Sequence, residues 1–124
     1  MSLRVALANA ALKQRAPQKR LKEYVLSTAQ RLLLIHLGEL GLKCVPEYRF
    51  DDTRRWRFDV WLPEARIGIE LDGGMWSGGH RHAAAIELDH EKSNTAAMMG
   101  IRCLRFTNRQ VEKGEAKDFI REWL

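Results

Sequence analysis

The stretch from Trp56 to Asp72, WRFDVWLPEARIGIELD, most constrains the fold of this chain. Apolar residues alternate in it twice, on either side of a Pro-containing turn, and this pattern predicts two neighbouring strands. The alternating apolar residues are Phe58, Val60 and Leu62, then Ile67, Ile69 and Leu71. We expect each set to lie on one face of its strand, because the side-chain period of a strand is two.

Acidic residues interrupt this apolar pattern at Asp59 and Glu70. A buried ionised carboxylate is costly unless it is paired or bound to a cation. Asp72 follows Glu70 by two positions and therefore shares its face of the strand. We expect these three acids to converge on a metal site. The alternative is that Asp59 and Glu70 are edge-strand charges paired with Arg57 or Arg66.

The length and composition of the chain indicate one globular domain. We expect it to span residues 1–124, with residues 1–16 as a basic N-terminal arm that can be flexible. Charged residues make up 30% and hydrophobic residues 45% of the chain, which argues against disorder. No apolar run reaches the ~20 residues of a membrane span, and we recognise no signal peptide. We therefore expect a cytoplasmic protein without a membrane partner, with Cys44 and Cys103 as buried free thiols.

The charge of the chain favours nucleic acid as its partner. The formal net charge is +5, and basic side chains that neutralise phosphates release counterions. Simple solubility is the alternative explanation. Basic residues crowd the N-terminal segment and flank the acidic strands, which predicts a basic rim around an acidic centre. The rim residues expected to contact nucleic acid are Lys19, Arg20, Arg54 and Arg55.

Periodicity and turn residues predict the other elements. The expected helices are 17–40, 83–99 and 110–123, and the expected further strands are 44–50 and 101–106. Pro46 places strand 44–50 at a sheet edge. The succession of strand, helix and strand that ends at residue 106 predicts a crossover between parallel strands. The sum is an α/β (α+β) fold with a central mixed sheet of about four strands flanked by helices.

The two outer helices are expected to bury apolar faces. For helix 17–40 these residues are Leu21, Val25, Leu32, Ile35 and Leu40, with Leu33, Leu34 and Leu37 widening the face. For helix 110–123 they are Val111, Phe119, Ile120 and Trp123. Trp56 and Trp61 are also expected in the core.

The glycine-rich stretch GGMWSGGHRH follows Asp72. It lacks the Lys-Ser/Thr ending of a phosphate-binding loop. We expect a loop over the acidic site, with Trp76, His80 and Arg81 contacting the substrate. Loop polarity explains His80 and His82 better than a zinc site does, since their spacing is poor for one.

The joint spacing of these pieces resembles the PD-(D/E)XK nuclease superfamily, which has a restriction-endonuclease-like core. More narrowly, the chain resembles a small single-domain group of phages and prophages that is related to the very-short-patch-repair endonucleases. The similarity spans residues 30–114 and lies in WRFDVWLPEARIGIELDGGMW, GGHRH and DHEKSNTAAMMGIRCLRF.

This resemblance implies a metal centre for Mg²⁺ or Mn²⁺. Asp59 and Glu70 match the two acids of the superfamily, and the backbone carbonyl of Leu71 is implied as a further ligand. Asp72 stands where the common pattern has a lysine, and it could join the metal ligands. Lys92, on the following helix, is then the candidate for the missing catalytic cation.

The resemblance also suggests auxiliary residues. Related nucleases often have a glutamate on their first helix, where this chain has Gln30. Glu23 and Glu47 are the other candidate acids.

We therefore expect a Mg²⁺- or Mn²⁺-dependent DNA endonuclease, a monomer or a homodimer, that acts in phage or prophage DNA repair, recombination or processing. Hydrolysis of a phosphodiester needs an activated water and neutralisation of the phosphoryl charge, which a carboxylate-bound metal ion and a lysine supply. One alternative is a catalytically inactive nucleic-acid-binding module that retains the nuclease core. Another is a toxin or interaction protein that uses the basic arm.

Overall fold

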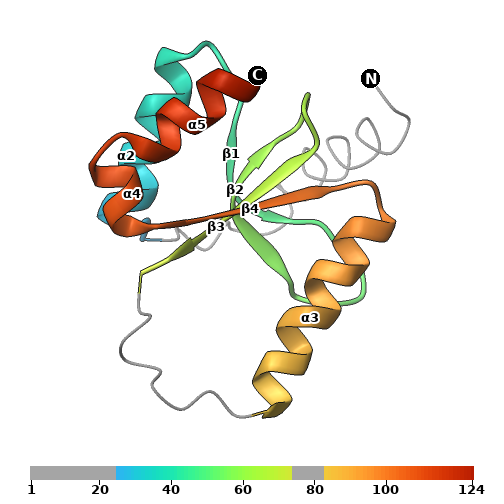
Figure 1. Ribbon diagram of the computed structural model, residues 1–124. Helices are drawn as coiled ribbons and strands as arrows, with labels where there is room; N and C mark the ends of the chain where they lie inside the picture. The colour runs from blue at the N-terminus through green and yellow to red at the C-terminus, as the bar shows by residue number, and fades with distance from the viewer. Residues whose placement is uncertain (1–24, 74–82) are drawn as a thin grey trace.

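The computed structural model describes residues 25–73 and 83–124 (Figure 1). The elements are α2 (Thr28–Glu39), β1 (Val45–Arg49), β2 (Arg57–Leu62), β3 (Ile67–Asp72), α3 (Ala83–Met98), β4 (Arg102–Thr107), α4 (Asn108–Glu112) and α5 (Glu115–Trp123). The predicted arm 1–16, the first turns of helix 17–40 and most of the glycine-rich stretch lie outside these described residues. No helix among the described residues is long and apolar enough to cross a membrane.

The four strands form one mixed sheet in the order β1-β2-β3-β4. The pairs β1–β2 and β2–β3 are antiparallel, whereas β3 and β4 are parallel. This arrangement confirms the predicted α+β fold, the edge position of the first strand and the parallel crossover through α3. It also places β2 and β3 inside the sheet, so Asp59 and Glu70 are not edge-strand charges.

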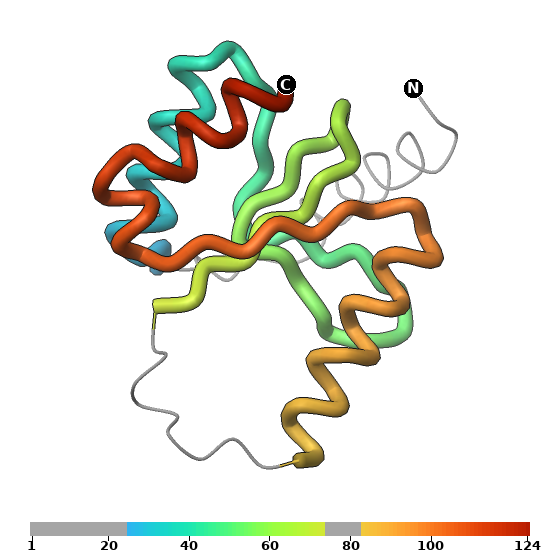
Figure 2. Tube along the Cα trace, in the orientation of Figure 1, coloured from blue at the N-terminus to red at the C-terminus, as the bar shows by residue number. Residues whose placement is uncertain are grey.

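Helices cover both faces of the sheet. On one face, α2, α4 and α5 lie side by side although α2 is far from the other two in sequence (Figure 2). The core of this face contains Leu33, Leu37, Val60, Ile69, Val111 and Ile120. On the opposite face, α3 packs over a second, aromatic-rich core that contains Tyr48, Phe50, Phe58, Trp61, Ala96 and Ile101.

The regular alternation of β2 breaks between Phe58 and Trp61. Both rings lie in the core under α3, with centroids 6.3 Å apart, whereas Val60 and Leu62 pack on the opposite face. The prediction that Phe58 shares a face with Val60 and Leu62 was therefore wrong. Phe58 finds room because Gly68 on β3 has no side chain, and a Cβ there would lie 2.5 Å from the ring.

Two predicted helices differ from the structure. Helix α2 begins only at Thr28, because Ser27 caps it, and its buried residues are Ala29, Gln30, Leu33 and Leu37. Val25 precedes it and is 90% exposed, so its predicted burial was wrong, and so was that of Ile35, which is also exposed.

The predicted helix 110–123 is two helices, α4 and α5, because Gly114 between them has a positive φ of 77°. Val111 and Ile120 are buried as predicted. Trp123 is 73% exposed and Phe119 is also exposed, so their assignment to the inner side was wrong.

Candidate active site

Glu70 and Lys92 meet in the space between the sheet and α3. Ile69 and Leu71 pack on the α2 side of the sheet, which turns Glu70 toward α3. From α3, the Lys92 ammonium donates hydrogen bonds to the Glu70 carboxylate and to the backbone carbonyl oxygen of Arg57, the latter at 2.6 Å. The Lys92 side chain is only 20% exposed. The structure thus brings together the predicted second acid and the predicted cationic residue.

Asp59 joins this pair from β2. Its Oδ2 accepts a hydrogen bond of 2.7 Å from the backbone N–H of Leu71, so the carboxylate is tied to the peptide that follows Glu70. Burial raises the pKa of Asp59, and the Leu71 hydrogen bond opposes this shift. Burial also raises the pKa of Glu70, against the Lys92 ammonium, and the Asp59 charge raises it further. Burial is thus the main cause of the raised pKa of both acids.

A small cavity of about 30 Å³ opens beside Glu70 and Lys92. It exceeds the roughly 10–15 Å³ that a water molecule needs. Its lining residues are Phe58, Glu70, Asp89, Lys92, Ser93, Cys103 and Arg105. The site therefore has space for water next to its carboxylate and its cations.

Arg105 is a site residue that the sequence did not reveal. It lies on β4 beside Glu70 in the parallel register, and its Nη2 is 3.5 Å from Oδ1 of Asp72. Two arginines, Arg102 and Arg105, interrupt the apolar strand IRCLRF, and the sequence does not distinguish between them. Asp72 thus lies in an ion pair at the margin of the site.

Gln30 and Glu47 support Asp59 from the α2 side. Gln30 is buried, and its Nε2 donates to the backbone carbonyl of Asp59 at 2.8 Å and to Oε1 of Glu47 at 3.0 Å. Glu47 has a positive φ of 54° and pairs with Arg57 at 3.5 Å. Gln30, predicted as an auxiliary residue, thus connects the start of α2 to the backbone of the first acid.

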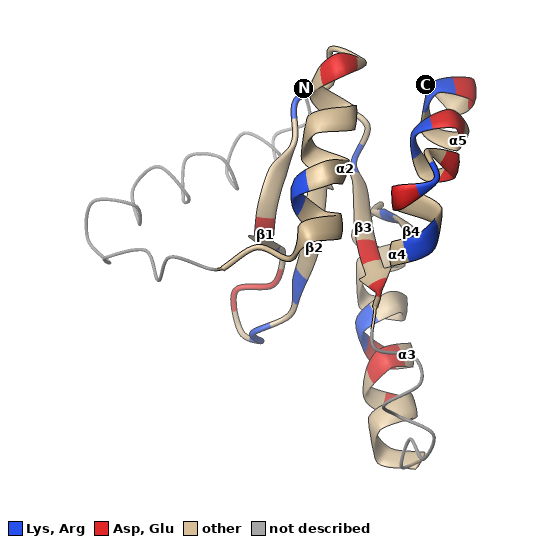
Figure 3. Cartoon of the chain, turned by 90° about the vertical axis from the view of Figure 1, so that its left-hand side faces the viewer, with Lys and Arg blue, Asp and Glu red and all other residues tan. Residues whose placement is uncertain are grey.

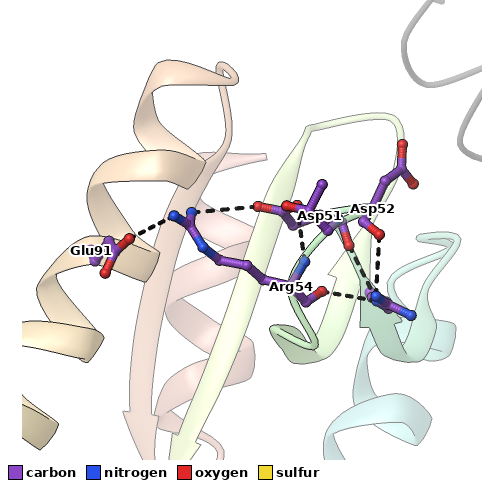
Figure 4. Close-up of polar contacts among 6 residues, drawn as sticks. Asp51, Asp52, Arg54 and Glu91 are labelled. Carbon is purple, nitrogen blue, oxygen red and sulfur yellow. Dashed lines mark hydrogen bonds and ion pairs between the residues drawn. The ribbon is translucent and has the colours of Figure 1, made fainter.

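The predicted rim is described only in part. Arg54 reaches from the loop between β1 and β2 to Glu91 on α3, where Nη2 and Oε1 are 2.7 Å apart (Figure 4). It also lies 3.9 Å from Asp51 and stacks over Trp56 at 4.5 Å. Arg55 is exposed. The remaining predicted contacts, Lys19, Arg20, Trp76, His80 and Arg81, and the candidate acid Glu23, lie outside the described residues.

The donors at this site suit a hard cation. The carboxylates of Asp59 and Glu70 are oxygen ligands of the kind that Mg²⁺ prefers. Figure 3 shows acidic residues within β3 and both charge signs along α3. Within residues 25–73 and 83–124, no group of three or more His, Cys, Asp and Glu side chains could hold a metal ion. A metal here would therefore depend on two carboxylates together with backbone or water oxygens.

Comparison with known proteins supports the fold. Neither a protein-family model nor a curated protein sequence matches the chain. A similar solved structure is the catalytic domain of the homing endonuclease I-Bth0305I, with a TM-score of 0.58 and 18% sequence identity. The similarity covers 77% of this chain and 92% of that domain. The chain therefore shares its fold with the catalytic domain of a nuclease, in line with the nuclease fold predicted from the sequence.

Proposed function

We propose that this chain is a metal-dependent DNA endonuclease of the PD-(D/E)XK type. The observation that carries the proposal is the contact of Lys92 with Glu70 beside Asp59, on a fold shared with a homing endonuclease catalytic domain. Two half-buried acids with raised pKa values and a positioned ammonium are a typical arrangement of catalytic sites. On an ordinary protein surface the same side chains would be exposed, and the pKa values of the acids would not be raised by burial.

The proposed ligands of Mg²⁺ or Mn²⁺ are Asp59, Glu70 and the Leu71 carbonyl. A bound ion would supply an activated water and offset charge on the phosphate. Burial raises the pKa of both acids, and a bound cation would oppose this shift by favouring their ionised forms. The N–H of Leu71 orients the Asp59 carboxylate, and the Arg57 carbonyl holds the Lys92 ammonium where it can orient water and neutralise developing charge.

The proposed biological setting is phage or prophage DNA repair, recombination or processing. It rests on the resemblance of the sequence motifs. The fold shared with a homing endonuclease domain supports DNA as the polymer that is cut.

A second candidate function is DNA binding without cleavage. It is favoured by the absence of a three-ligand group in the described part of the chain and by Lys92, which already neutralises Glu70. A module of this kind would keep the core and bind DNA with the same basic residues.

A cleavage panel separates the two functions. Supercoiled, linear, branched and single-stranded DNA would be incubated with Mg²⁺ or Mn²⁺ and with wild-type protein, Asp59→Asn or Asp118→Asn. Asparagine keeps an oxygen for the Leu71 N–H, whereas alanine would leave that donor unpaired. Asp118 is an exposed acid paired with Arg121 and is the matched control.

We expect the wild type and Asp118→Asn to cleave at least one substrate. Asp59→Asn should be at least about 100-fold slower, because the loss of several kcal/mol of charge stabilisation has that effect on a rate. DNA binding by the wild type with no cleavage of any substrate would favour the binding module.

A further inference from the structure

Two cations flank Glu70, and the protein holds them differently. The Lys92 ammonium has three donors, and two of them are already directed at Glu70 and the Arg57 carbonyl. It also lies 5.4 Å from the centre of the Phe58 ring. Arg105 lines the same cavity, yet its side chain is 47% exposed. The more accessible cation at the site is therefore Arg105.

The strand register fixes where Arg105 stands. In the parallel pairing of β3 and β4, Glu70 lies beside Arg105. Leu104 and Phe106 pack on the α2 side of the sheet, which leaves Arg105 on the side of the cavity. The guanidinium is thus anchored on a strand next to the proposed metal ligand.

The chemistry of the guanidinium suits a phosphate. Arginine has five N–H donors in a planar fork that can bind two phosphate oxygens at once. The contact of its Nη2 with Asp72 measures 3.5 Å, which is longer than the roughly 3.2 Å limit of a good hydrogen bond. Asp72 therefore attracts and orients the guanidinium while donors remain for another acceptor.

We propose that Arg105 binds the phosphate group that is cut, and that Asp72 is a positioning residue for Arg105. This inference rests on the proposed nuclease function and identifies a second substrate-contacting cation for the same site. It also gives a role to Asp72, at the position where the resembled superfamily has a lysine: Asp72 orients Arg105, and Arg105 is the cation at that end of the site. In this arrangement Lys92 orients the water and Arg105 binds the phosphate.

The test uses single-turnover cleavage of the DNA substrate that the wild type cuts fastest. Arg105→Ala should lower the rate by about 100- to 1000-fold, the usual effect of removing one donor that stabilises transition-state charge. The rate of Arg105→Lys should lie between the rates of the wild type and Arg105→Ala, because lysine keeps the positive charge but lacks the planar fork of donors. The matched control is Arg121→Ala, which breaks an exposed Arg–Asp pair on α5 and should leave the rate unchanged.

Added guanidinium provides a readout that a merely structural role would not change. Millimolar guanidinium chloride should restore part of the Arg105→Ala activity and none of the Lys92→Ala activity. Thermal unfolding of each variant establishes that it is folded. If Arg105→Ala does not fold, Arg105→Lys provides the test, and a wild-type rate for that variant counts against the proposal.

The role of Asp72 is tested by a double-mutant cycle. Asp72→Asn should slow cleavage less than Arg105→Ala does, and the double variant should be no slower than Arg105→Ala. Effects that multiply would overturn the positioning role and favour Asp72 as a metal ligand. Normal cleavage by Arg105→Ala overturns the phosphate contact and leaves the nuclease function intact. A wild type that cuts no DNA overturns both.

Discussion

Lys92 on α3 connects the two sides of the site, since its ammonium donates hydrogen bonds to Glu70 and to the Arg57 carbonyl oxygen. Lys92→Ala should lower the single-turnover cleavage rate by at least about 100-fold, the lower range for a positioned proton-transfer group. DNA affinity, measured without divalent metal, should change much less. Lys92→Arg should not restore the rate fully, because a guanidinium differs in shape and stays protonated. A Lys92→Ala enzyme that cuts at the normal rate would remove Lys92 from the mechanism.

Asp59 makes a second prediction, which concerns stability and pH. Because its pKa is higher in the folded chain than the ordinary value of 3.8, the folded state keeps the proton to higher pH than the unfolded state does. The stability from this group is present below its ordinary pKa and is lost as pH rises through the raised value. Asp59→Asn abolishes this loss.

Urea unfolding at about pH 4 and about pH 7 measures the effect. Relative to the wild type, Asp59→Asn should have a larger free energy of unfolding, and so be more stable, at the higher pH than at the lower pH. Asp118→Asn, at an exposed acid, is the control. A relative stability of Asp59→Asn that falls with rising pH would contradict the raised pKa.

The sequence allowed some site residues to be predicted because their signals are local. Asp59 and Glu70 stand out against the apolar alternation of their strands, whereas Lys92 was predicted through the resemblance to the PD-(D/E)XK superfamily. Arg105 could not be found in this way, because its place beside Glu70 depends on the register between two strands far apart in sequence. The positive φ of Glu47 likewise has no signal in its residue type.

Among the elements, the strands and α3 could be predicted because turn residues separate clear periodic patterns. The break of the C-terminal helix at Gly114 was missed, since a glycine within a helical pattern can be tolerated or can end a helix. Trp123 lies at the C-terminal end of α5 and is exposed, whereas Ala116 and Ile120 are the residues that α5 buries. The position of Phe58 on the face opposite Val60 and Leu62 could not be predicted either, because it depends on the space over Gly68 in the neighbouring strand.

A pair of glycine substitutions tests how β2 and β3 pack. Gly68→Ala places a Cβ 2.5 Å from the Phe58 ring and should destabilise the protein by about 1–3 kcal/mol, as overpacking of a core does. Gly38→Ala, within α2 and with nothing inside 4 Å, should stabilise it by up to about 1 kcal/mol through helix propensity. Denaturant unfolding measures both changes. Equal stability of Gly68→Ala and the wild type would contradict the packing of Phe58 against Gly68.

For the whole molecule, the surplus of positive charge predicts salt-sensitive DNA binding. Without divalent metal, Arg55→Ala should reduce the slope of log affinity against log salt by about one unit, the value of one phosphate contact. Arg54→Ala should reduce it less, because Glu91 and Asp51 already pair with Arg54. Fluorescence anisotropy over a salt series measures the slopes. Binding that does not depend on salt would indicate a different partner.

The central claim is that Asp59 and Glu70 form the centre of a metal-dependent nuclease, and DNA cleavage by Glu70→Gln tests it most directly. Glu64→Gln is the matched control, since Glu64 is an exposed acid paired with Lys43 at 3.7 Å. Cleavage of a supercoiled plasmid would be followed with Mn²⁺ or Mg²⁺ and with a chelator. We expect cleavage by the wild type and Glu64→Gln only with metal, and none by Glu70→Gln. Cleavage by Glu70→Gln at the wild-type rate, or equal cleavage in the chelator, would contradict the claim.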